Sequence, residues 1–246
     1  MPQRRLTRVV LGLVIALVLV GGGLGAAVAG GWLLHDTAKP ASVSRVVARL
    51  RTSGGKGAVY VYATRGSESI NAFVSARHVY PLRTAVTIVP ASCGHRLTWA
   101  ALEGRRTTWL LCRTGRGLEL RAETEVHKFF GQSDRTTYSC TGAVLGAHDA
   151  TYTCRSSRGS ESGWVFALGH ESVAVGGRSL EALNVRTVGR VKGGDSGTEV
   201  TDWWFDANGL PLRIGFTSRT SRPLKVGRAH YRESADLRLV STTPRH

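Results

Sequence analysis

Glu123, Glu125 and His127 have side chains that commonly bind metals. They occupy every second position at the end of Gly117–Val126, a stretch predicted to be a strand, and His127 follows directly after it. Side chains two apart on a strand share a face, so the three would form a row. Neighbours in such a row are about 7 Å apart, too far to converge easily on one ion. We therefore interpret the row as a solvated strand face, with the leucines of this stretch inward, and predict no metal or cofactor.

A second candidate for chemistry is Ser196, within Gly194-Asp195-Ser196-Gly197. This segment resembles the nucleophile loop of chymotrypsin-type serine proteases, where an activated serine lies beside donors for the oxyanion. The resemblance implies a base, for which His78 is the candidate. Thr198 and Glu199 stand where that family has Gly-Pro. A serine hydrolase using Ser196 and His78 is therefore the alternative function, and a non-enzymatic domain is the leading one.

The N-terminal part of the chain is predicted to cross a membrane. Val9–Leu34 is a run of 26 residues without a charge, preceded by Arg4, Arg5 and Arg8. About 20 apolar residues suffice to span the hydrocarbon core, and arginines before a span favour a cytoplasmic N-terminus. We predict a cytoplasmic segment 1–8, a transmembrane signal anchor 9–34 and a single-pass protein whose C-terminal domain is extracytoplasmic. The alternative is a signal peptide cleaved after Ala27-Val28-Ala29.

The chain is strongly basic. Its net charge is +16, and leaving out the three arginines before the span gives 30 basic against 17 acidic residues, or +13, for the rest. These charges are spread along the chain, whereas a nucleic-acid module would concentrate them on one element. We predict no nucleic-acid partner. Two interpretations stay open, a soluble surface matched to an anionic envelope and a specific anionic partner.

Four cysteines in an exported chain favour disulfides. Two strands flanking the turn 102–106 place Cys93 opposite Cys112, and two strands around a turn near residue 147 do the same for Cys140 and Cys154. We therefore predict the pairs 93–112 and 140–154. A zinc site would need C-x-x-C spacing, which the sequence lacks.

A short helix is predicted in the linker 35–57. Ser42 can cap it, and its apolar positions, spaced i, i+3, i+4 and i+7, are Val43, Val46, Val47 and Leu50. This stripe either packs on the following sheet or lies on the membrane surface.

From residue 58 to residue 246 the hydrophobic period is two, which indicates strands. Turn signals separate them, such as Gly176-Gly177, which suits a two-residue hairpin, and Asp206–Gly209. We predict a mainly β protein: one transmembrane helix, then a large antiparallel meander of roughly ten to twelve strands, forming a curled sheet or half-barrel with the short helix at its front.

The order of an amphipathic helix, a Val59-Tyr60-Val61-Tyr62 strand and the hairpin 203–213 resembles the exported half-barrels of lipoprotein carriers and of an anti-sigma-factor regulator. That resemblance implies a concave apolar surface that binds lipid or a partner protein. With Cys93-Gly94 and the stretch 129–135, the chain is also similar to membrane-anchored exported proteins of high-GC Gram-positive bacteria.

The leading functional prediction is a membrane-tethered, extracytoplasmic, non-enzymatic β domain that binds a lipid or a partner protein of the cell envelope. Trp203 and Trp204 are the candidate ligand face. Alternation places one of the two in the core, and the exposed one could contact a ligand. The sequence predicts no oligomeric state.

Overall fold

A computed structural model describes residues 36–52 and 56–245. The predicted span 9–34 lies outside this range. Within it, no helix has the length and apolar character needed to cross a membrane. The described part forms one compact unit that begins at Asp36.

Helix α2 (Val43–Thr52) precedes fourteen strands in the described residues. The strands are β1 (Ala58–Asn71), β2 (Ser75–Val79), β3 (Arg83–Ala91), β4 (Gly94–Leu102), β5 (Arg105–Thr114), β6 (Gly117–Phe129), β7 (Gln132–Thr141), β8 (Val144–Leu145), β9 (Ala150–Arg155), β10 (Gly159–Val175), β11 (Arg178–Gly193), β12 (Ser196–Phe205), β13 (Pro211–Pro223) and β14 (Arg228–Leu239).

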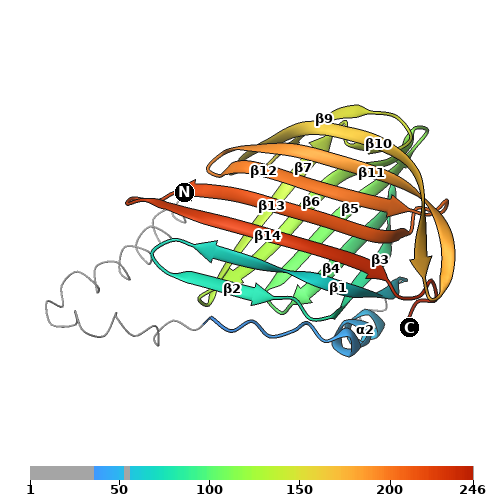
Figure 1. Ribbon diagram of the computed structural model, residues 1–246, viewed down its shortest axis with the longest axis horizontal. Helices are drawn as coiled ribbons and strands as arrows, with labels where there is room; N and C mark the ends of the chain where they lie inside the picture. Colours follow the sequence, from blue (N-terminus) through green and yellow to red (C-terminus); the bar gives the residue numbers. More distant parts are fainter. Residues whose placement is uncertain (1–35, 53–55, 246) are drawn as a thin grey trace, which may run out of the picture. The chain divides into compact units, whose positions relative to one another are not determined.

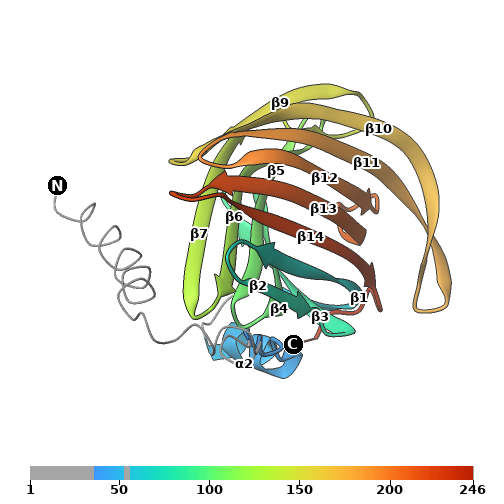
Figure 2. The ribbon, with the colours of Figure 1, turned by 60° about the vertical axis from the view of Figure 1, so that its left-hand side comes forward.

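Twelve of these strands close into an antiparallel barrel (Figures 1 and 2). Each strand pairs with the next along the wall, and β14 pairs with β1 from Tyr62↔Leu239 to Asn71↔His230. The short strands β2 and β8 pair with β1 and β6 outside this circuit. The predicted antiparallel meander is confirmed, but the sheet closes on itself instead of remaining a half-barrel. Closure removes the exposed edges that an open sheet would leave.

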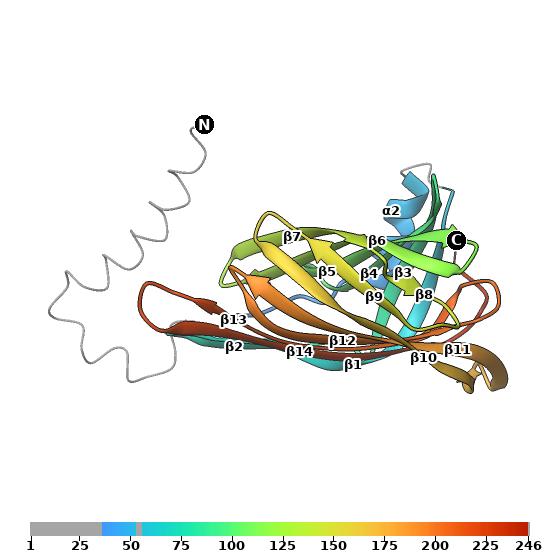
Figure 3. The ribbon, with the colours of Figure 1, turned by 90° about the horizontal axis from the view of Figure 1, so that it is seen from above.

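The two ends of the barrel differ. The turns that follow β1, β6, β11 and β13 lie at one end, which we call the tip end (left in Figure 1; Figure 3 shows it from above). The Cys93–Cys112 disulfide lies toward the other end, beside the turn between β3 and β4, and we call this end the disulfide end. There the β10–β11 hairpin turns through Gly176 and Gly177, whose φ values of 57° and 80° suit glycine.

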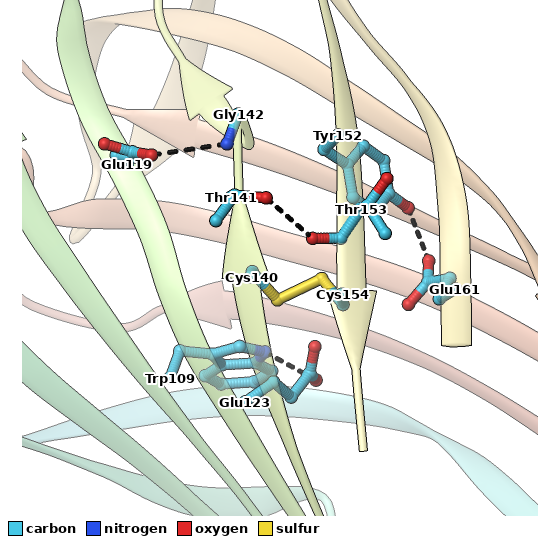
Figure 4. The surroundings of a disulfide bond; sticks show 10 residues. All are labelled: Trp109, Glu119, Glu123, Cys140, Thr141, Gly142, Tyr152, Thr153, Cys154 and Glu161. Atoms are coloured by element: carbon cyan, nitrogen blue, oxygen red, sulfur yellow. Dashed lines mark hydrogen bonds between the residues drawn. A yellow bond between two sulfur atoms is a disulfide. The ribbon is translucent and has the colours of Figure 1, made fainter. Parts of the chain in front are cut away.

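Both predicted disulfides are confirmed. Cys93 and Cys112 have Cα atoms 4.8 Å apart, and Cys140 and Cys154 have Cα atoms 4.0 Å apart. Cys140 and Cys154 are direct cross-strand partners between β7 and β9 (Figure 4). The second disulfide thus links two neighbouring strands of the barrel wall.

Helix α2 follows the predicted pattern. The Ser42 hydroxyl accepts a hydrogen bond from the Arg45 amide, as an N-cap does. The apolar stripe is half-buried, whereas Arg45 and Arg49 on the other side are exposed. The helix lies against β1 and β3, so its stripe packs on the sheet.

The barrel interior is divided into an apolar half and a polar half. Large apolar side chains, among them Trp99, Trp203, Leu212 and Leu237, fill the half toward the disulfide end. Trp99 packs edge-to-face on Tyr80, and Trp203 does so on Trp109, arrangements that aromatic rings prefer. The polar half lies toward the tip end and contains the candidate site.

A β-bulge decides which side chains enter that polar half. The pairing of β5 with β6 shifts between Leu120 and Ala122, so Arg121 is the extra residue. A one-residue shift turns every following side chain to the other face. Glu119 and Arg121 point outward as predicted and form an ion pair, but Glu123 and Glu125 turn inward. The prediction of a solvated glutamate face is wrong beyond the bulge.

Candidate functional site

The polar half of the interior is organised around Arg105, which is 1% exposed. Its Nε and Nη2 donate to the two carboxylate oxygens of Glu233, both at 2.8 Å. Its Nη1 donates to Thr107 at 2.6 Å, and the guanidinium lies 5.3 Å from the centre of the Trp99 ring. This forked geometry is the strong form of an arginine–carboxylate pair. Arg105 is therefore the central cation of the interior.

A second carboxylate, Glu68, faces Glu233 directly across β1 and β14. It bonds Nδ1 of His78 at 3.0 Å and Nδ1 of His127 at 3.1 Å, and the Tyr231 hydroxyl donates to it at 3.1 Å. Like charges directly opposite on a sheet repel each other. The histidines and Arg105 offset that repulsion.

These contacts move the pKa values of the network. Burial and Arg105 lower the pKa of His127, but its hydrogen bonds with Glu125 and Glu68 outweigh them and raise it to about 9. Burial alone would raise the pKa of Glu125, yet the bond from His127 and the nearby Arg105 lower it to about 2. At neutral pH the network therefore pairs charged carboxylates with a protonated His127.

Next to this network lies a cavity of about 40 Å³ that five glutamates line: Glu123, Glu125, Glu161, Glu199 and Glu233. By size it has room for about three water molecules. Burial, followed by the neighbouring carboxylates, raises the pKa of Glu123 and Glu199 well above the usual range. Ligand pockets for lipid-sized molecules measure about 300 Å³ or more. This cavity is too small for a lipid.

Each of the remaining carboxylates at the cavity has a neutral hydrogen-bond donor. Trp109 Nε1 donates to Glu123 at 2.8 Å, and the Tyr152 hydroxyl donates to Glu161 (Figure 4). These donors favour the ionised carboxylates, but burial and the neighbouring carboxylates outweigh them and raise the pKa values of Glu123, Glu161 and Glu199, so that the protonated forms are favoured. The wall of the cavity is therefore mostly neutral and hydrogen-bonded.

Glu125, His127 and Glu233 bring one ligand atom each to within 4.8 Å of one another. This group includes two members of the row predicted from the sequence and adds Glu233 from β14. Arg105 occupies both oxygens of Glu233 and lies 3.6 Å from Glu125. A metal ion would have to compete with that guanidinium and with the proton on His127. We interpret the group as an ion-pair network in which Arg105 is the cation.

The structure does not bring Ser196 and His78 together. Ser196 is exposed at the start of β12, where Arg228 donates to its hydroxyl. Across the wall it is four strands from Ser75 in β2, or about 19 Å at the usual strand spacing. Both ring nitrogens of His78 bond carboxylates, those of Glu68 and Asp36. His78 is therefore out of reach of Ser196 and is already bonded to other groups.

Trp203 and Trp204 do not form an exposed face, because they are 1% and 7% exposed. Trp203 stacks on Phe205 inside the barrel. Trp204 is covered by Arg213, whose guanidinium lies 4.4 Å from its ring centre, and its Nε1 donates to Glu171 of β10. The predicted ligand face is thus covered by neighbouring side chains.

Charges of opposite sign are separated between the interior and the outer wall. Six of the 17 acidic residues, the five at the cavity and Glu68, are interior, so 11 remain elsewhere. Of the 30 basic residues after the predicted span, one, Arg105, is interior, so 29 remain. The rest of the domain thus carries a net +18. This is more than the +13 of the composition alone, so the outer wall is the more distinctive surface.

Exposed cations gather on the outer wall near the tip end. Arg219 of β13 lies directly opposite Arg232 of β14, and Arg190 of β11 is two strands from Arg219, with Thr198 of β12 paired to both. None of the three arginines has an ion-pair partner among the residues that the structure describes. Elsewhere Arg213 also faces Arg238, but there Asp236 bonds both. We call Arg190, Arg219 and Arg232 the arginine belt.

An open groove of about 710 Å³ adjoins the belt on the outside of β9, β10 and β11. Exposed Arg190 and Lys192 line one side, Trp164 is 57% exposed, and Thr151 and Thr153 offer hydroxyl groups. Cations, hydroxyl donors and an aromatic ring together suit an anionic ligand with some apolar surface.

Sequence reasoning missed both features. The interior network depends on Arg105, Glu68 and Glu233. These residues are far apart in the chain, and the pairing of β1 with β14 brings Glu68 and Glu233 together. The belt could have been found by aligning the arginines of consecutive predicted hairpins in register. A comparison with protein-family models finds no matching family, and comparisons with curated proteins and with solved structures find no match to either.

Proposed function

We propose that the chain is a non-enzymatic binding domain, held at the extracytoplasmic face of the membrane, whose outer wall binds an anionic component of the cell envelope. The observation that carries this proposal is the arginine belt, in which Arg219 and Arg232 face each other without an acid between them. Two unpaired like charges in direct opposition destabilise a sheet. An anionic ligand that bridges them would relieve that repulsion.

The interior supports the same assignment. Its cavity of about 40 Å³ is too small for a substrate, and Arg105 and His127 there are bonded to glutamates. Ser196 lies about 19 Å around the wall from β2, the strand of His78. We therefore propose no catalytic role for Ser196, and a fluorophosphonate probe should leave it unlabelled.

The test is binding of the full chain, in a neutral detergent, to a soluble fluorescent polyanion such as poly(glycerol phosphate). A belt variant carries Arg190→Glu, Arg219→Glu and Arg232→Glu. Polybasic contacts to an anionic surface contribute about fivefold each, so its affinity should fall by more than about a hundredfold.

The matched control carries Arg96→Glu, Arg106→Glu and Arg135→Glu, three exposed arginines on β4, β5 and β7. Its net charge equals that of the belt variant. We expect it to retain most of the affinity, because its substitutions lie on other strands of the wall. Equal losses in the two variants would show that total charge, and not the belt, binds the polyanion, and would overturn the proposal.

A further inference from the structure

The tip end exposes apolar side chains on two adjacent hairpin turns. In the β1–β2 turn Phe73 is 68% and Val74 is 37% exposed, and in the β13–β14 turn Val226 is 69% exposed. The two turns are neighbours because Asn71 pairs with His230 across β1 and β14 (Figures 1 and 3). Large apolar side chains at the tips of projecting turns are costly in water. Such tips mark a surface that something apolar covers.

Cations surround these apolar tips. Lys225 and Arg228 are exposed in or beside the β13–β14 turn, and Arg77 is exposed on β2. Arg232 lies four residues from the start of β14 and pairs with Ser69, two residues before the end of β1. Apolar residues at the centre and cations around them match an anionic bilayer, whose head groups are negative and whose acyl region is apolar.

The first described residue of the chain, Asp36, is held at the same tip end. Asp36 accepts hydrogen bonds from His78 Nε2 at 3.1 Å and from the Phe130 amide, in the β6–β7 turn, at 2.8 Å. The described part of the chain therefore begins at the same end of the barrel as the exposed apolar side chains.

Resting on the proposed function, we infer that its anionic partner is the lipid bilayer itself, on which the tip end docks. Phe73, Val74 and Val226 enter the head-group region, and the basic residues around them contact lipid phosphates. The barrel axis then stands across the membrane plane, with the disulfide end pointing away.

The test uses the full chain reconstituted into vesicles of phosphatidylglycerol and phosphatidylcholine in equal parts. All four cysteines are in disulfides, so Phe73→Cys or Val226→Cys adds a single reactive thiol for an environment-sensitive fluorophore. Ala147→Cys, exposed between β8 and β9, reports on the disulfide end. Lipids that carry a quencher near the head group should quench the fluorophore at residues 73 and 226 at least about twofold more than at residue 147.

Replacing phosphatidylglycerol by phosphatidylcholine should reduce that quenching. If the fluorophores at residues 73 and 226 stay in water in anionic vesicles, the docking inference is wrong. The proposed function would still stand in that case, provided that the belt variant loses polyanion binding. If those fluorophores are quenched but the belt variant binds the polyanion as tightly as the unaltered chain, the proposed function fails and the docking is apolar.

Discussion

Removing the guanidinium of Arg105 should destabilise the barrel more than any other single loss of charge in the interior. Arg105 makes two bonds to Glu233 and one to Thr107, and it lies within 3.8 Å of Glu68. Breaking a buried ion pair by removing one partner costs about 3–5 kcal/mol, because the other charge stays buried without its counter-ion. That is a large share of the 5–15 kcal/mol typical of a domain. We expect Arg105→Met to lower the free energy of unfolding by about 3–5 kcal/mol.

The assay is urea unfolding at pH 7 with the disulfides intact, followed by tryptophan fluorescence. The matched double variant, Arg105→Met with Glu233→Gln, removes the uncompensated carboxylate as well. Replacing both partners of a buried pair costs much less than removing one, so the double variant should be more stable than Arg105→Met alone. A loss below about 1 kcal/mol in the single variant, the size typical of a surface pair, would refute this reasoning. So would a double variant that is less stable than the single one.

Three further predictions concern the same domain. The pKa of His127 is about 9 in the folded chain, above the unfolded value near 6.5, so the stabilisation from its protonation is complete below pH 6.5 and is lost as pH rises toward 9. The free energy of unfolding should therefore fall by about 3 kcal/mol more between pH 6 and pH 9.5 in the unaltered chain than in His127→Gln. Burial raises the pKa of Glu199, so the neutral form is favoured and Glu199→Gln should gain stability relative to the unaltered chain as pH rises above about 4.5; an unchanged difference across that range would contradict it. The Cys93–Cys112 bridge closes a separation of 19 residues, so Cys93→Ser and Cys112→Ser should each lose about 3 kcal/mol and the double variant little more, measured by the same unfolding curves.

The parts of the fold that the sequence predicted are local. Cys140 and Cys154 flank one short connection, and Gly176-Gly177 directly joins β10 to β11, so the signal and the structure span the same few residues. Barrel closure is different, because β1 and β14 come from opposite ends of the domain and the sequence of neither strand indicates that the two pair. Without that pairing, Glu68 and Glu233 could not be placed together.

Two smaller errors have local physical causes. The bulge at Arg121 reverses the alternation of β6, and no glycine or proline marks it in the sequence, so a strict period of two predicts the wrong face for Glu123 and Glu125. Trp204 does point away from the barrel core, yet Arg213 and Glu171 cover it, and such covering depends on neighbouring strands. A period-two pattern predicts on which face of the sheet a side chain lies, but not which side chains of neighbouring strands cover it.

The affinity of the full chain for a soluble polyanion, measured as a function of salt concentration, tests the role of the arginine belt most directly. Interactions between exposed charges are screened within about 8 Å at physiological ionic strength, so binding through the belt must weaken as salt is added. We predict a steep loss for the unaltered chain and a much shallower one for the variant with Arg219→Glu and Arg232→Glu. An affinity that does not change with salt, or an equal salt dependence in both proteins, would contradict binding through these arginines.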